Sequence, residues 1–128
     1  MPSPLPLLFA CSGCSNAGQL ANTLAHELDR RGCAEMSCLA GVGAAKPHFL
    51  RQLIGREVWV IDGCLIECSL GVFEQIREQI DVHIRLHELG VRKNAPPPVG
   101  SELDDLIAAV LRQVEQQKQV TLRDPGQL

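Results

Sequence analysis

The chain has 128 residues, of which 45% are apolar and 21% are charged, a composition typical of one globular domain with its own core. The formal net charge of −3, with no long run of Lys or Arg, excludes a large nucleic-acid-binding surface, and we expect no nucleic acid as a partner. Aromatic residues make up only 3%, which leaves little material for base stacking.

The first half of the chain predicts two strand and helix pairs. Residues 7–10 form a short apolar run, typical of an interior strand in a parallel sheet. Apolar residues then recur at helical spacing from Asn16 to Arg30. Residues 34–40 predict a second strand, which a glycine-rich turn and a short helix from Pro47 to Ile54 follow.

The second half continues the alternation. Residues 57–61 are strongly β-prone and predict a third strand. Apolar residues keep helical spacing over residues 66–80. In residues 82–86 apolar side chains alternate with His and Arg, which predicts an edge strand with one wet face.

The C-terminal part predicts a connector, a helix and a tail. Residues 94–100 are rich in proline and predict a stiff connector. An amphipathic helix is expected from Ser101, and residues 121–128 are expected to be a flexible tail. This helix can pack on the sheet or on another subunit, so a homo-oligomer formed through it stays open.

Strands that alternate with helices indicate an α/β fold. We predict a single three-layer domain over residues 1–128, with a mainly parallel four-stranded sheet of the Rossmann or flavodoxin-like kind. Ligands of such sheets bind outside the carboxyl ends of the strands, near the point where the strand order reverses.

Five of the six cysteines fall at this predicted carboxyl edge. Cys11 and Cys14 follow the first strand, Cys38 ends the second, and Cys64 and Cys68 follow the third. We therefore expect these thiols to converge in one crevice.

The two cysteine pairs suit a soft metal ion. A Cys-x-x-Cys pair and a Cys-x-x-x-Cys pair can each chelate one ion, the second because residues four apart share a helix face. Together they supply four thiolates, which fit tetrahedral Zn²⁺ or an iron–sulfur cluster, with Cys38 as a fifth candidate. Asp62 and Gly63 precede Cys64, and we expect Asp62 to accept hydrogen bonds from loop amides and to support the ligands.

Redox chemistry is the alternative. A Cys-x-x-Cys pair that opens a helix after a strand is also the thioredoxin-like arrangement. In a thiol-dependent oxidoreductase or sulfur-transfer enzyme, Cys11 would attack, Cys14 would resolve the mixed disulfide, and Cys64 or Cys68 would relay. Both hypotheses stay open at this point.

Other candidate residues have simpler structural explanations. We predict that Cys33 and Met36 belong to the core, since free cysteine and methionine are commonly buried. His26 is predicted to be exposed. His87 ends the edge strand on the ligand side, so an approach to the site is the alternative, but exposure is the default expectation.

The sequence around Cys11 also bears on the compartment. Leu8-Phe9-Ala10-Cys11 resembles a lipoprotein cleavage site, but no Lys or Arg precedes it and three prolines interrupt the apolar run. No other apolar stretch is long enough to span a bilayer. We therefore expect a soluble, cytoplasmic protein without a membrane partner, in which cysteines serve thiolate chemistry rather than disulfides.

Three motifs in order, CSGCSNAGQLAN, AEMSCLAGVG and VIDGCLIEC, resemble the DGC-domain family over roughly residues 5–95. The resemblance implies zinc chelation by cysteines, with no established reaction. Cys11, Cys38, Cys64 and Cys68 match the most regular cysteines of the family, and Cys14 matches a Cys-x-x-Cys subset. Leu65 stands where proline is frequent in the family.

Overall fold

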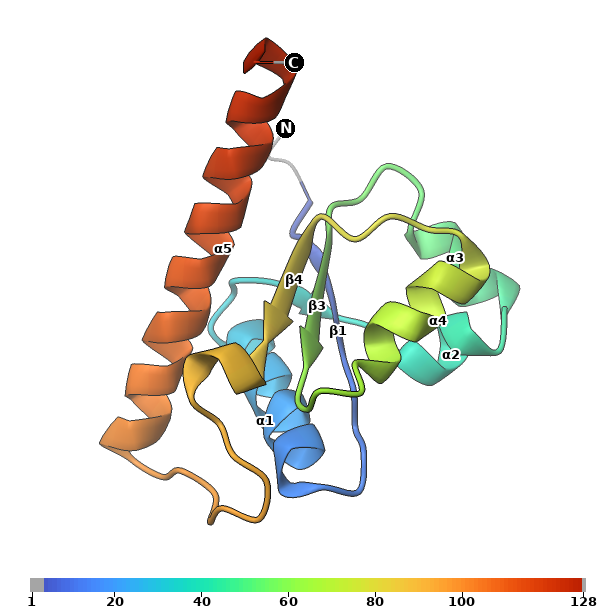
Figure 1. Cartoon of the computed structure of the whole chain (residues 1–128). Coiled ribbons are helices and arrows are strands. Elements are labelled where there is room, and N and C mark those ends of the chain that lie inside the picture. Colours follow the sequence, from blue (N-terminus) through green and yellow to red (C-terminus); the bar gives the residue numbers. More distant parts are fainter. Residues whose placement is uncertain (1–3, 128) are drawn as a thin grey trace.

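The computed structural model describes the backbone of residues 4–127 and the side chains of residues 4–119. Its four strands form one all-parallel sheet in the order β2-β1-β3-β4, with helices on both faces (Figure 1). The α/β fold predicted from the sequence is therefore confirmed. The strands are β1 (Leu7–Ala10), β2 (Glu35–Met36), β3 (Val58–Asp62) and β4 (Val82–Arg85).

One face of the sheet is covered by α1 (Asn16–Arg30) and α5 (Ser101–Gln127). Helix α1 begins where predicted because Ser15 caps it, accepting a hydrogen bond from the Gly18 amide at 3.1 Å. Its apolar residues lie three or four positions apart and so form one buried stripe. The buried side chains of this face that come from the two helices are Leu20, Ala21, Leu24, Ala25, Leu28, Ile107, Val110 and Val114.

The opposite face is covered by three short helices, α2 (Leu39–Gly43), α3 (Pro47–Gln52) and α4 (Cys68–Ile76). Phe73 of α4 packs edge-to-face on Phe9 of β1, with ring centroids 5.1 Å apart. Both side chains are at most 1% exposed, and burying each contributes about 1.5–3 kcal/mol. Two apolar layers thus hold the sheet and leave its ends free for function.

The strand predicted over residues 34–40 is wrong in its second half. β2 contains only Glu35–Met36, and Leu39–Gly43 forms α2. Cys38 caps this helix, since its Sγ accepts a hydrogen bond from the Gly41 amide at 3.4 Å. The small and apolar residues of this segment are compatible with a strand or a helix, and packing against the sheet selects the helix.

The helix predicted over residues 66–80 is also shorter than expected. Helix α4 spans Cys68–Ile76, between Glu67 and Arg77, which both adopt left-handed backbone with φ of 54° and 58°. A left-handed residue cannot continue a right-handed helix, so these two positions fix its ends.

β4 lies at the edge of the sheet, as predicted, but its polar face is not wet. The side chains of His83 and Arg85 are only 10% and 33% exposed. They contact Asp62 and Glu67, because the loop between β3 and α4 lies over this face of β4.

Helix α5 closes the outer edge of β4. The Gln117 carboxamide accepts a hydrogen bond from the His83 amide at 2.8 Å and donates one to the His83 carbonyl at 2.7 Å. A side chain thus takes the place of a neighbouring strand and protects an edge that could otherwise pair with another chain. A homo-oligomer formed through α5 stays a prediction.

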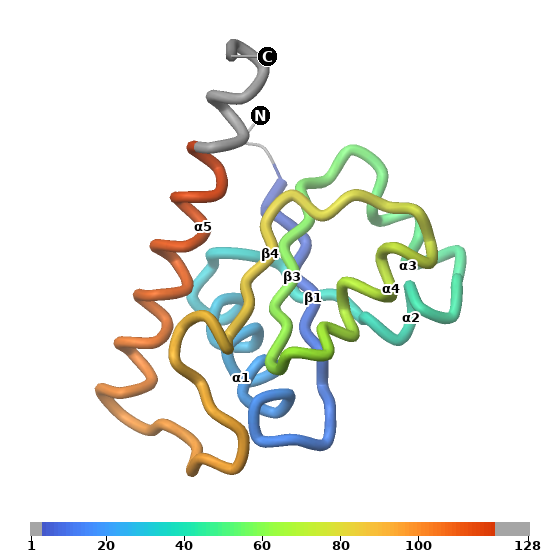
Figure 2. Tube along the Cα trace, viewed as in Figure 1, coloured from blue at the N-terminus to red at the C-terminus, as the bar shows by residue number. Residues whose placement is uncertain are grey.

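The segment between the 3₁₀ helix η1 (Leu86–Leu89) and α5 returns to the start of α1 (Figure 2). Asn16 holds it there, because its Nδ2 donates to the Arg92 carbonyl at 2.8 Å and its Oδ1 accepts from the Asn94 amide at 2.7 Å. The tail expected at residues 121–128 falls outside the side chains that are described. Over residues 4–127, none of the helices has both the length and the apolar character needed to cross a membrane.

Candidate functional site

The strand order reverses between β1 and β3, because β2 adds on one side of β1 and β3 on the other. Ligands of open α/β sheets bind outside the strand ends at this reversal. Cys11 directly follows β1, and Cys64 stands two residues after β3. Two cysteine-bearing loops therefore border the place where the fold favours a ligand.

These two loops touch. The Gly63 amide donates a hydrogen bond to Cys11 Sγ at 3.1 Å, and Cys11 is 8% exposed. A Cβ on Gly63 would lie 2.2 Å from the Ala17 carbonyl oxygen and 2.8 Å from the Gly18 nitrogen. Only glycine therefore lets the loop that carries Cys64 dock against the start of α1.

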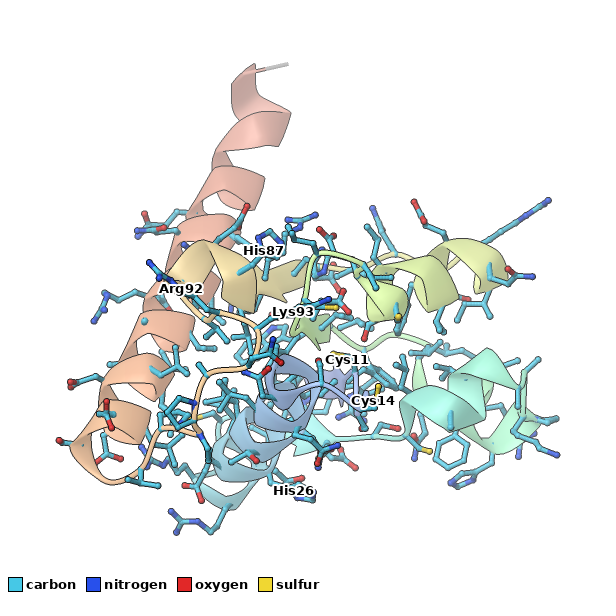
Figure 3. All side chains as sticks on the ribbon, turned by 60° about the horizontal axis from the view of Figure 1, so that its bottom comes forward. Cys11, Cys14, His26, His87, Arg92 and Lys93 are labelled. Carbon is cyan, nitrogen blue, oxygen red and sulfur yellow. The ribbon has the colours of Figure 1, made fainter. Side chains whose placement is uncertain are left out.

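The loop between β1 and α1 is held equally tightly. Gln19 Nε2 donates to the Gly13 carbonyl at 2.8 Å, and a Cβ on Gly18 would lie 2.8 Å from the Gly13 nitrogen. Cys14 is exposed on this compact loop. Figure 3 shows Cys11 and Cys14 near the start of α1, with His26 further along the helix.

Burial raises the pKa of the Cys11 thiol. The amides of Gly63 and Gly13 work in the opposite direction, and the Asp62 carboxylate and the Cys64 thiol raise the pKa further. Cys11 therefore holds its proton more firmly than an exposed cysteine, and a metal ion that displaces this proton would find two amide donors already directed at the sulfur.

Asp62 ties the loop after β3 to two other elements. Its fully buried carboxylate accepts hydrogen bonds from the amides of Ser69 at 2.9 Å and Leu70 at 3.2 Å, in the first turn of α4. Its Oδ2 also lies 2.7 Å from His83 Nε2 in β4. Burial raises the pKa of Asp62, but His83 and the Ser69 amide outweigh it and hold the pKa below its ordinary value.

Glu67 stands directly before α4, between Cys64 and Cys68 in the sequence. Its Oε1 accepts a hydrogen bond from Arg85 Nε at 3.0 Å, and its Oε2 lies 3.6 Å from His87 Nε2. Burial acts to raise the pKa of Glu67, but Arg85 and the two histidines lower it below the ordinary value. Left-handed backbone at Glu67 costs about 1–2 kcal/mol, and these contacts offset that cost.

Asp62, Glu67 and His83 form a group that can hold a metal ion. One ligand atom from each lies within 4.8 Å of the other two. Within the described part of the chain, the thiols form no comparable group of three. The predicted thiolate site is therefore not assembled in this conformation, and ligation by Cys11, Cys14, Cys38, Cys64 and Cys68 stays a prediction.

The five thiols differ in access. Cys11 is buried and Cys64 is half-buried, whereas Cys14, Cys38 and Cys68 are exposed. All five stand at the carboxyl edge of the sheet.

Cys38 opens into a cavity of about 830 Å³ between α1 and α2. Ser12, His26 and Asp29 also line this cavity, whereas Cys64 does not. Cys38 thus lies on the β2 side of Cys11, opposite to the loop after β3.

Sequence reasoning missed His83 and Glu67 and was wrong about His87. The His87 side chain is 24% exposed and faces Glu67 rather than open solvent. The alternation in β4 carried a usable signal, because it places His83 and Arg85 on one face, and the register places Arg85 opposite Asp62. Cys33 and Met36 pack against the core while half-buried, and His26 is exposed, as predicted.

Comparisons with known proteins place the chain in a family. It is 47% identical over 91 residues to the anaerobic and virulence modulator AnvM of Pseudomonas aeruginosa, an alignment that covers 70% of each chain. No solved structure matches the chain. Residues 7–114 match the DGC domain, and the segment contains both cysteine-bearing loops, Asp62 and Gly63. The protein therefore belongs to the DGC-domain family.

Proposed function

We propose that this protein binds Zn²⁺ through cysteine thiolates at the carboxyl edge of its sheet and acts in the cytoplasm in metal binding, carrying or sensing. The observation that carries the proposal is the contact between the two loops at the strand-order reversal, where the Gly63 amide bonds to Cys11 Sγ. Cys11 and Cys64 are the central ligands of this proposal.

The chemistry of the donors supports a soft or borderline ion. Cys14 and Cys68 are exposed; Cys14 shares the loop of Cys11, and Cys68 begins α4 directly after the loop that carries Cys64, so the two can add to a set of four thiolates. Cys38 is an alternative ligand from the β2 side. Thiolate ligands favour Zn²⁺ over Mg²⁺ or Ca²⁺.

The apolar layers on both faces support a role in exchange rather than in folding. A zinc finger needs its ion because it has little core, whereas this sheet is packed on both sides. Exposed thiols next to a buried one also give a partner access to the ion. The name of the Pseudomonas relative describes a modulator, and a sensing role would agree with it.

A second candidate function is thiol redox or sulfur transfer by the Cys-x-x-Cys pair. The exposure of the thiols favours a reversal of the predicted roles, because burial raises the pKa of Cys11 and Cys14 is exposed. Cys14 would attack and Cys11 would resolve, since the attacking species must be an accessible thiolate. An iron–sulfur cluster is a further possibility for the same ligands.

The test is the metal content and visible absorbance of protein purified without oxygen or chelators. We expect a colourless protein with about one Zn²⁺ per chain, which the Cys11→Ser and Cys64→Ser variants lose. Cys33→Ser is the matched control, because Cys33 lies outside the two loops, and it should keep the ion. Metal-free parent protein that forms a Cys11–Cys14 disulfide would favour the redox function, and brown protein would indicate a cluster.

A further inference from the structure

Two carboxylates and two imidazoles converge under the loop between β3 and α4. His83 Nε2 lies 2.7 Å from Asp62 Oδ2 and 4.0 Å from Glu67 Oε1. His87 Nε2 lies 3.6 Å from Glu67 Oε2. None of these groups is a thiol, and none is a ligand in the zinc site proposed above.

We infer that Asp62, Glu67, His83 and His87 form a second metal site, for a divalent first-row ion that accepts nitrogen and oxygen ligands. Ligand atoms about 2.1 Å from one ion lie about 3 to 4.2 Å from each other, depending on the geometry. Asp62, Glu67 and His83 each offer one ligand atom within 4.8 Å of the other two. His87 adjoins this group through Glu67, whose Oε2 lies 3.6 Å from His87 Nε2, so side-chain shifts would admit the ion.

His87 supplies an independent sign of a missing partner. Its Nε2 atom is buried and makes no hydrogen bond within the described part of the chain, although it points toward Glu67. Buried ring nitrogens are normally paired, and an ion between His87 and Glu67 would pair this one. The other three ligands are also well covered, with side chains 0%, 20% and 10% exposed for Asp62, Glu67 and His83.

The charge of the site also favours a cation. The carboxylates of Asp62 and Glu67 face one permanent positive charge, which belongs to Arg85. The Arg85 side chain is 33% exposed, so its head can turn into solvent when an ion takes its place at Glu67. An ion here would fasten the segment from Cys64 to Cys68 onto β4, beside the thiols but without using them.

The inference does not rest on the proposed zinc function. Mn²⁺ is the probe, because it prefers the oxygen ligands of carboxylates to thiolates. We expect metal-free, reduced protein to bind about one Mn²⁺ per chain, measured by the loss of the free-ion signal in electron paramagnetic resonance. The double variant Cys11→Ser/Cys64→Ser should bind Mn²⁺ equally well.

Single variants test the ligands. His87→Gln and Glu67→Gln should each weaken Mn²⁺ binding about tenfold or more, a loss typical of altered metal sites. His26→Gln, a change at an exposed histidine on α1, should leave the affinity unchanged. Asp62 is left intact because it also caps α4, and circular dichroism confirms that each variant is folded.

Three results would overturn the inference: parent protein that binds no Mn²⁺, ligand variants that bind as tightly as His26→Gln, or binding that disappears with the two thiols. Loss of zinc from the thiol variant, with Mn²⁺ retained, supports two separate sites. Zinc-free parent protein that still binds Mn²⁺ removes the proposed function alone.

Discussion

Replacing Gly63 by alanine tests whether the close contact between the two loops builds the site. The new Cβ would lie 2.2 Å from the Ala17 carbonyl oxygen and 2.4 Å from its carbonyl carbon. These neighbours are backbone atoms at the start of α1, so no side-chain rotation can relieve the overlap. The two loops must move apart.

The size of the effect follows from this distance. Real Cβ atoms essentially never come closer than 3.0 Å to such a neighbour, so the backbone must shift by at least 0.8 Å, the difference between 3.0 and 2.2 Å. Overpacking in a close-packed region costs about 1–3 kcal/mol. Because the neighbour of the new Cβ is rigid backbone, we expect Gly63→Ala to lower the free energy of unfolding by about 3 kcal/mol. This loss is a large part of the free energy of unfolding of a typical domain, which is about 5–15 kcal/mol.

Urea denaturation followed by circular dichroism measures this free energy of unfolding. Gly71→Ala is the matched control, because the residue is inside α4 and its new Cβ would have no atom within 4 Å apart from its chain neighbours and the backbone of its own helix. Alanine there should stabilise the protein by up to about 1 kcal/mol. A cost below about 1 kcal/mol would contradict the close docking of the loops, and an unchanged zinc affinity would contradict its role in building the site.

Three further results are expected from the same denaturation assay. Asp62→Asn should cost about 2 kcal/mol at pH 7, because the carboxylate accepts charge-assisted hydrogen bonds. The pKa of native Asp62 is below the ordinary 3.8, so its contribution to the free energy of unfolding is present above about pH 4 and is lost as the pH falls through the native pKa. A difference in stability between parent and Asp62→Asn that persists unchanged at pH 2 would contradict this. Gln117→Ala should cost about 1–2 kcal/mol, because it exposes the β4 edge. Gln116 is exposed, so Gln116→Ala should cost under about 0.5 kcal/mol, and equal costs for the two variants would refute the edge-closing role of Gln117. The pKa of native Cys11 is raised above 9.0, so the unfolded chain loses this proton first and the free energy of unfolding falls as the pH rises past about 9. A Cys11→Ser variant whose stability falls equally would show that Cys11 is not the cause.

Much of the fold could be predicted from local patterns. The apolar run of β1 and the helical stripe of α1 each indicate one structure, because a buried strand and an amphipathic helix place their apolar residues differently. The segment before α2 was ambiguous, since the same residues fit a strand or a helix, and packing and the Cys38 cap decided between them. The late start and early end of α4 were also hidden, because left-handed backbone at Glu67 and Arg77 depends on their tertiary surroundings.

The candidate site, like the fold, could be predicted from the sequence only in part. The sequence alone determined that five of the six cysteines follow strands and therefore stand at one edge of a parallel sheet, because that placement needs only strand order and direction. The tertiary structure alone decided which of them is buried, that Gly63 passes against Ala17, and that Asp62 reaches His83 across 21 positions of the chain. Such contacts arise between segments distant in sequence, and their distances depend on how helices and sheet pack, which no local pattern encodes.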